Sequence, residues 1–193
     1  EHNTGHFTVN NKFADYFGTI YEHLLTAVVK KYVDKFYGVS GSCNKWMGHF
    51  RIKANGVFYN AIDVKDASKV KNTYNKKYPK DVIVITYAGR LLKEKGILNL
   101  LQAFKKVESE HGSEKVRLAI AGDGELYDEI KKNYKGSNID ILGRLDFNKV
   151  MSLFKRTDIF VYPSLYPEGL PTSILEAGLM NCAVIATPKG GTE

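Results

Sequence analysis

Hydrophobic positions in the second part of the chain switch between short continuous runs and helical spacing. Residues 82–86, 116–121 and 159–162 are mainly apolar and of strand length. Between the first two runs, apolar residues recur every three or four positions over 97–107. Short buried runs separated by amphipathic helices predict a parallel sheet covered by helices on both faces. We therefore expect an α/β fold with a Rossmann-like doubly wound parallel sheet, whose ligands bind at the carboxyl ends of the strands.

The same rhythm continues toward the end of the sequence. Residues 139–143 and 184–186 are the remaining strand candidates. Asp146 is placed to cap the helix that follows it. A further helix is expected to begin near Thr172, because the fixed dihedral of Pro171 suits a first helical turn.

The first 80 residues are less regular. Helical spacing covers residues 13–25 and 25–36, and short strand candidates are residues 35–39 and 56–59. These elements are too few for a complete domain of the doubly wound type.

A lysine-rich stretch separates the irregular part from the regular one. We expect residues 1–65 to be the trailing part of an amino-terminal domain, residues 66–80 to be a linker, and residues 81–193 to be a second domain that is truncated at its end. The chain is thus interpreted as a fragment of a longer protein.

Composition adds few constraints. The content of 44% apolar and 25% charged residues is that of a soluble globular protein. Cys43 and Cys182 are far apart, which favours free thiols in a reducing cytosol over a disulfide. The net charge of +7 arises from lysines interspersed with glutamates, which favours a solvated surface with a modest basic face over a nucleic-acid site.

Two glutamates, Glu168 and Glu176, carry the most informative chemistry of the chain. They flank a loop in which Gly169 lets the backbone approach a ligand. A helix starting after this loop would present free amides and a positive dipole end. Carboxylates beside such a helix start suit a ligand with both hydroxyl and phosphate groups, as in a nucleotide sugar. Taken alone, a glutamate early in a helix is ordinary dipole compensation.

The surrounding residues favour the functional interpretation. Pro163-Ser164, Glu168-Gly169 and the segments 175–178, 184–187 and 190–193 occur in order and without gaps. Together they resemble the donor-binding segment of the family-4 retaining glycosyltransferases of GT-B fold (glycosyl transferases group 1). The resemblance implies the carboxyl-terminal donor domain of such an enzyme, preceded by an incomplete amino-terminal acceptor domain.

The resemblance also implies roles for individual residues. Arg90 and Lys95 would hold the donor diphosphate, Glu176 the ribose hydroxyls and Glu168 the transferred sugar, while His2, with His6 as a rival, would lie near that sugar. The catalytic set is Glu168, Arg90, Lys95 and His2. The donor-binding set is Gly89, Gly122, Gly143, Arg144, Gly169, Leu170, Pro171, Thr172 and Glu176. A tight turn also explains Gly122, and a turn is favoured over a metal-binding acid pair for Asp123 and Glu125.

The implied function is transfer of a sugar, with retention, from a nucleotide-diphospho-sugar to a polysaccharide or glycolipid acceptor. No cofactor and no metal are expected, and no nucleic acid is expected as a partner. The enzyme would be cytoplasmic, and its charge suits peripheral contact with an anionic membrane face. The isolated chain would be inactive, because catalysis needs donor and acceptor held together by two domains. The alternatives are a non-catalytic nucleotide-sugar binding module and a nucleotide-sugar epimerase on the same fold.

Overall fold

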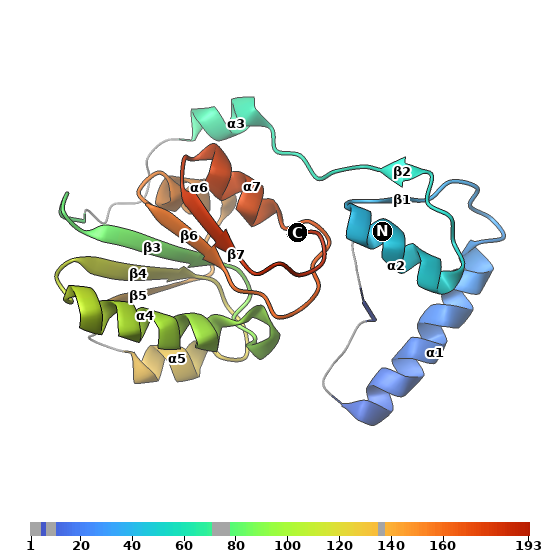
Figure 1. The fold of residues 1–193 in the computed structure, drawn as a ribbon, viewed down its shortest axis with the longest axis horizontal. Helices are drawn as coiled ribbons and strands as arrows, with labels where there is room; N and C mark the ends of the chain where they lie inside the picture. Colours follow the sequence, from blue (N-terminus) through green and yellow to red (C-terminus); the bar gives the residue numbers. More distant parts are fainter. Residues whose placement is uncertain (1–4, 7–10, 71–77, 135–137) are drawn as a thin grey trace. The chain divides into compact units, whose positions relative to one another are not determined.

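The computed structural model describes residues 5–6, 11–70, 78–134 and 138–193 (Figure 1). The chain divides into two compact units. The first contains residues 1–60, 166–171 and 188–193, and the second contains residues 61–165 and 172–187.

The second unit is built on a five-stranded parallel sheet. Its strands are β3 (Ile83–Ala88), β4 (Val116–Ala121), β5 (Ile139–Gly143), β6 (Ile159–Tyr162) and β7 (Ala183–Ala186). Their order across the sheet is β5-β4-β3-β6-β7, and every neighbouring pair is parallel. The chain therefore builds outward from β3 to one edge and then returns to the other side of β3. The expected α/β fold is confirmed. The continuous apolar runs of the sequence are the strands of this sheet.

Helices cover both faces of this sheet (Figure 1). One face packs against α4 (Ile97–His111) and α5 (Tyr127–Asn133), around a core that includes the fully buried Phe104. The opposite face packs against α3 (Val64–Lys69), α6 (Phe147–Phe154) and α7 (Thr172–Leu179). This two-sided burial explains why the strands read as continuous apolar runs rather than alternating ones.

Several local expectations are met. The Asp146 side chain accepts a hydrogen bond from the Lys149 amide at 2.9 Å and caps α6, as the sequence predicts. Helix α7 begins at Thr172. Both cysteines are free and buried. The expected linker, residues 66–80, overlaps helix α3. Ala67 and Val70 in this region are apolar and are buried in the core of the second unit, so this part of the chain is packed rather than a free connection.

The first unit agrees with the prediction in part: one helix covers the expected residues 13–25, and both short strands lie within the expected ranges 35–39 and 56–59. Its helices are α1 (Lys12–Val29), α2 (Gly41–Met47) and the 3-10 turn η1 (Gly48–Phe50), and its strands are β1 (Tyr37–Gly38) and β2 (Gly56–Val57). The expected helix over 25–36 is wrong, because α1 continues past residue 25 and ends at Val29, after which the chain turns toward β1. Helix α2, capped by the Ser40 hydroxyl, was not predicted.

The sequence boundaries expected for the domains remain a prediction. The two loops 166–171 and 188–193 group with residues 1–60, although they fall within the expected second domain. They are joined to each other by the hydrogen bond from the Gly191 amide to the Glu168 carbonyl at 2.7 Å. Within the described residues, no helix is both long and apolar enough to cross a membrane.

Candidate functional site

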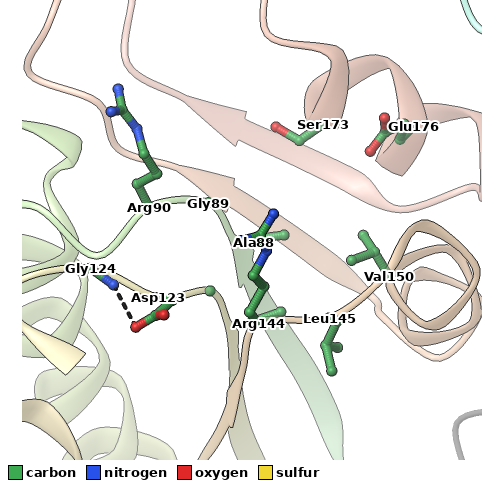
Figure 2. Close-up of a pocket in the computed structure, with 12 residues that line it drawn as sticks. Ala88, Gly89, Arg90, Asp123, Gly124, Arg144, Leu145, Val150, Ser173 and Glu176 are labelled. Carbon is green, nitrogen blue, oxygen red and sulfur yellow. Dashed lines mark hydrogen bonds between the residues drawn. The ribbon is translucent and has the colours of Figure 1, made fainter. Parts of the chain in front are cut away.

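A pocket of about 600 Å³ opens at the carboxyl ends of β3, β4 and β5 in the second unit. Its volume lies in the range usual for small-molecule sites. The residues that line it are Ala88, Gly89, Arg90, Ala121, Gly122, Asp123, Gly124, Arg144, Leu145, Val150, Ser173 and Glu176. Figure 2 shows Arg90 and Arg144 rising from strand ends and Ser173 and Glu176 projecting from α7. This is the side of a doubly wound sheet on which ligands bind.

Hydrogen bonds between the strand-end loops form the floor of the pocket. The Gly89 amide donates to the Ala121 carbonyl at 3.0 Å, and the Gly122 amide donates to the Gly143 carbonyl at 2.8 Å. The Leu91 amide donates to the Asp123 carbonyl at 2.9 Å. Because these bonds join three successive loops, the lining residues are fixed relative to one another before any ligand binds.

Glycine is required at position 122 for steric reasons. Its φ is +154°, and a Cβ atom there would lie 1.8 Å from the Gly89 carbonyl oxygen. The predicted tight turn is therefore present, and the same glycine lines the pocket. The Asp123 carboxylate accepts the Gly124 amide at 2.8 Å, which is the turn role that the sequence favoured over metal binding (Figure 2).

Arg90 is held through its backbone while its side chain is exposed. The hydroxyl of the buried Tyr87 donates to the Arg90 carbonyl at 2.6 Å. A guanidinium anchored at its base in this way is suited to hold a planar group of acceptors such as phosphate oxygens. Arg144 follows β5 and brings a second guanidinium to the same pocket.

Glu176 is the acidic residue of the α7 wall. Burial raises the pKa of its carboxyl above the usual value, and a hydrogen bond from the Thr172 side chain opposes part of this shift. The same hydrogen bond orients the carboxylate, because Thr172 lies one helical turn earlier in α7. Leu145 and Val150 supply apolar surface to the pocket, which suits a flat ring such as a nucleotide base.

The structure gathers part of the predicted set in this pocket. Gly89, Arg90, Gly122, Arg144 and Glu176 line it. Three other predicted residues of the second unit, Lys95, Gly143 and Thr172, are not among its lining residues. Lys95 ends the 3-10 turn η2 (Lys93–Lys95) just before α4. Four residues of the site were not predicted: Ser173, Leu145, Val150 and the supporting Tyr87. The only indication in the sequence was that each lies close to the end of an expected strand or to an expected helix.

The remaining predicted residues belong to the first unit or lie outside the described residues. Glu168, Gly169, Leu170 and Pro171 form the loop of the first unit that ends at Pro171. The Leu170 carbonyl accepts a hydrogen bond from the Asn60 side chain at 2.7 Å, and Glu168 forms a parallel bridge with Gly190. The loop is thus anchored within its unit. His2 lies outside the described residues.

Comparison with known proteins identifies the family. A sequence model of the glycosyl transferases group 1 matches residues 70–193, which is most of the chain. The chain belongs to the glycosyl transferases group 1. The matched region contains the whole sheet of the second unit and every residue that lines the pocket.

Individual relatives agree with this assignment. The chain is 24% identical over its full length to an uncharacterized glycosyltransferase of Methanocaldococcus jannaschii, of which it covers 50%. It is 36% identical over 98 residues to the UDP-Gal:alpha-D-GlcNAc-diphosphoundecaprenol alpha-1,3-galactosyltransferase of Escherichia coli, covering 49% of this chain and 25% of that protein. The chain thus spans half or less of the length of these curated relatives.

Solved structures show the same fold. Sucrose-phosphate synthase from Thermosynechococcus elongatus matches with a TM-score of 0.73 over 96% of this chain and 48% of its own, at 18% identity. Anabaena HepE in complex with UDP and glucose matches with a TM-score of 0.63 over 82% of this chain and 45% of its own, at 21% identity.

Proposed function

We propose that the protein to which this chain belongs transfers a sugar, with retention of configuration, from a nucleotide-diphospho-sugar to a saccharide or lipid-linked saccharide. The observation that carries the proposal is the pocket at the strand ends, where two guanidinium groups lie in one cavity with a half-buried carboxylate. Such a cavity offers cations for a diphosphate and an acceptor for ribose hydroxyls.

The relatives support this choice of substrate class. The Escherichia coli relative is named for a UDP-sugar donor and a diphosphoundecaprenol-linked acceptor. HepE was solved with UDP and glucose. In our proposal Arg90 and Lys95 hold the diphosphate, Glu176 holds the ribose, and Glu168 contacts the transferred sugar together with the amides of Gly169 and Leu170. His2 takes part at the reacting sugar.

The proposed chemistry uses only groups of the protein and the substrates, without a metal in the reaction. Negative charge develops on the leaving diphosphate and positive charge develops on the transferred sugar as the glycosidic bond breaks. Fixed cations at the diphosphate and a fixed carboxylate at the sugar stabilise these charges more in the transition state than in the ground state. The enzyme is proposed to work in the cytoplasm, with its basic surface suited to an anionic membrane face.

The two glutamates provide the test, because they act on different parts of the donor. In the full-length protein, Glu176→Gln should mainly raise KM, since the ribose does not react, whereas Glu168→Gln should mainly lower kcat. Steady-state kinetics with varied donor and saturating acceptor measure this split. The roles are wrong if both variants keep kcat/KM within about threefold of wild type, a change of less than 1 kcal/mol.

The same assay separates the alternatives. An epimerase would convert the donor sugar without any acceptor. A binding module would bind the donor and leave both substrates unchanged. Either result in the full-length protein would replace the proposed transferase activity.

A further inference from the structure

Three histidines far apart in the sequence converge in the first unit. The Nε2 atom of His49 lies 3.0 Å from Nε2 of His6 and 3.1 Å from Nε2 of His23. His6 precedes α1, His23 lies on α1, and His49 lies in η1. Their ligand atoms all lie within 4.8 Å of one another. None of them belongs to the pocket described above.

Hydrogen bonding alone does not satisfy this arrangement. A ring nitrogen of a neutral histidine carries either one proton or one lone pair. The Nε2 atom of His49 therefore forms a direct hydrogen bond with only one of its two neighbours. A cation placed among the three nitrogens accepts a lone pair from each of them at once.

The state of His6 favours a metal ligand. Its Nδ1 atom lies 2.5 Å from the Glu22 carboxylate. Because a carboxylate only accepts, Nδ1 carries the proton, so that in the neutral ring the lone pair is on Nε2, the atom that faces His49. A histidine that ligates a metal typically donates its other ring nitrogen to such a carboxylate, which fixes the tautomer and increases the basicity of the ligand.

Aromatic residues enclose one side of the cluster. The Trp46 ring stacks on His49 with centroids 4.6 Å apart and an angle of 5° between the planes. The Phe50 ring lies edge-on to His49 at 5.1 Å. The Tyr166 hydroxyl donates to the His6 carbonyl at 3.2 Å and anchors that residue within its unit. The imidazole rings are therefore oriented by their surroundings before an ion binds.

We propose that His6, His23 and His49 form a site for a divalent transition metal ion, with Zn²⁺ as the ion that the ligand set fits. Zinc takes neutral imidazole nitrogens at ~2.0–2.1 Å in a tetrahedral arrangement, which places neighbouring nitrogens about 3.3–3.4 Å apart. The two separations from His49, 3.0 and 3.1 Å, need only a small outward movement, and the remaining pair, His6 and His23, lies within 4.8 Å. Three protein ligands leave a fourth position for water or another small ligand.

The ion would connect three segments of the first unit. Helix α1 has no buried residue, so a bond from His23 to the segments carrying His6 and His49 would restrain a helix that packing alone holds weakly. The inference goes beyond the proposed sugar transfer and does not rest on it.

The chain contains its own reporter for this site. Trp46 is the single tryptophan of the sequence, and it stacks on a proposed ligand. Zn²⁺ is titrated into the tag-free 193-residue chain, with binding followed by calorimetry and by Trp46 fluorescence. We expect saturable binding of one Zn²⁺ per chain, a change in Trp46 emission with the same midpoint, and a rise in Tm.

Variants assign the site. His23→Ala and His49→Ala, both at exposed positions, should each weaken Zn²⁺ binding at least tenfold and remove the rise in Tm. Glu22→Gln should weaken binding about 10- to 100-fold, the range for groups that orient a ligand. His111→Ala, at the end of α4, is the matched control and should bind as wild type. Circular dichroism verifies that each variant is folded.

Two results would overturn the proposal. One is the absence of saturable Zn²⁺ binding by the wild-type chain. The other is binding that persists unchanged in both His23→Ala and His49→Ala, which would place the metal elsewhere.

Discussion

Replacing Glu176 by glutamine should weaken nucleotide binding and at the same time stabilise the free protein. The Glu176 carboxyl is half-buried, and this burial raises its pKa while the Thr172 hydrogen bond opposes the shift. For an acid whose pKa is raised by folding, the neutral form is favoured in the folded state. The Glu176 carboxyl therefore contributes its full stabilisation at pH values below its pKa in the unfolded state. This contribution is lost as the pH rises through its pKa in the folded state.

The weaker nucleotide binding and the higher stability of Glu176→Gln both follow from loss of the carboxylate charge. At neutral pH the buried carboxylate is a cost to the free protein, and glutamine of nearly equal shape removes it, so the Tm of Glu176→Gln should be at or above that of wild type. In the complex, the carboxylate accepts hydrogen bonds from the ribose hydroxyls. A hydrogen bond to a charged group is worth about 1.5–3 kcal/mol, which corresponds to roughly 10- to 150-fold in affinity.

The pH dependence separates this account from a general packing effect. Wild-type affinity for a nucleotide sugar should fall as the pH is lowered through the raised pKa of Glu176, because the protonated carboxyl is a poorer acceptor. The affinity of Glu176→Gln should stay flat across the same window. A nucleotide sugar is preferred as the ligand, because its diphosphate has no terminal phosphate that titrates near pH 6.

Calorimetry between pH 4.5 and 7.5, with Tm measured at each pH, would test the reasoning. Equal affinity of wild type and Glu176→Gln at pH 7 would refute the ribose role. An equally steep pH dependence in both proteins would show that another group titrates.

Three further predictions concern the pocket and its supports. Arg90→Ala should weaken nucleoside-diphosphate binding by ~1.5–3 kcal/mol in calorimetry. Lys93 is exposed and does not line the pocket, so Lys93→Ala should leave binding unchanged. Equal losses of affinity in the two variants would contradict a specific phosphate contact. Gly122→Ala should destabilise the chain by at least about 1–3 kcal/mol in denaturant unfolding, because its Cβ meets the Gly89 carbonyl, whereas Gly178→Ala in open space on α7 should be neutral or stabilising. Asp146→Ala should lower Tm through loss of the α6 cap. The Lys149 amide hydrogen bond lowers the pKa of Asp146. The Tm of wild type should therefore exceed that of Asp146→Ala above the ordinary aspartate pKa, and this difference should disappear as the pH falls through the lowered pKa. A Tm difference that persists in strong acid would contradict the capping role.

The sequence predicted the second unit well because both faces of its sheet are buried. Continuous apolar runs such as 116–121 have few alternative structures when helical spacing follows them, and β4 coincides with that run. The capping role of Asp146 and the start of α7 at Thr172 were also readable, since they depend on local residue chemistry.

The first unit was less predictable for physical reasons. Helix α2 is short and contains Gly41 and Asn44, and its buried face is a single pair, Cys43 and Met47, which is too short a pattern to predict a helix. The pattern over 25–36 is apolar enough for a helix, yet the chain leaves the helix after Val29.

Contacts between residues distant in sequence were out of reach. His6 and His49 are 43 positions apart, and no spacing rule connects them. The hydroxyl of Tyr87 supports Arg90 through a loop geometry that only the folded backbone defines. By contrast, Arg90, Arg144 and Glu176 were predicted and do line one pocket, because strand ends and a helix start converge at one edge of a parallel sheet.

A crystal structure of this chain grown with UDP, GDP or ADP would show directly whether the pocket is a nucleotide site. We expect a nucleoside diphosphate in the pocket of the second unit, with its phosphates on the Arg90 guanidinium and its ribose hydroxyls on the Glu176 carboxylate. A nucleotide bound elsewhere on the chain, or an ordered complex in which neither side chain contacts it, would contradict the account.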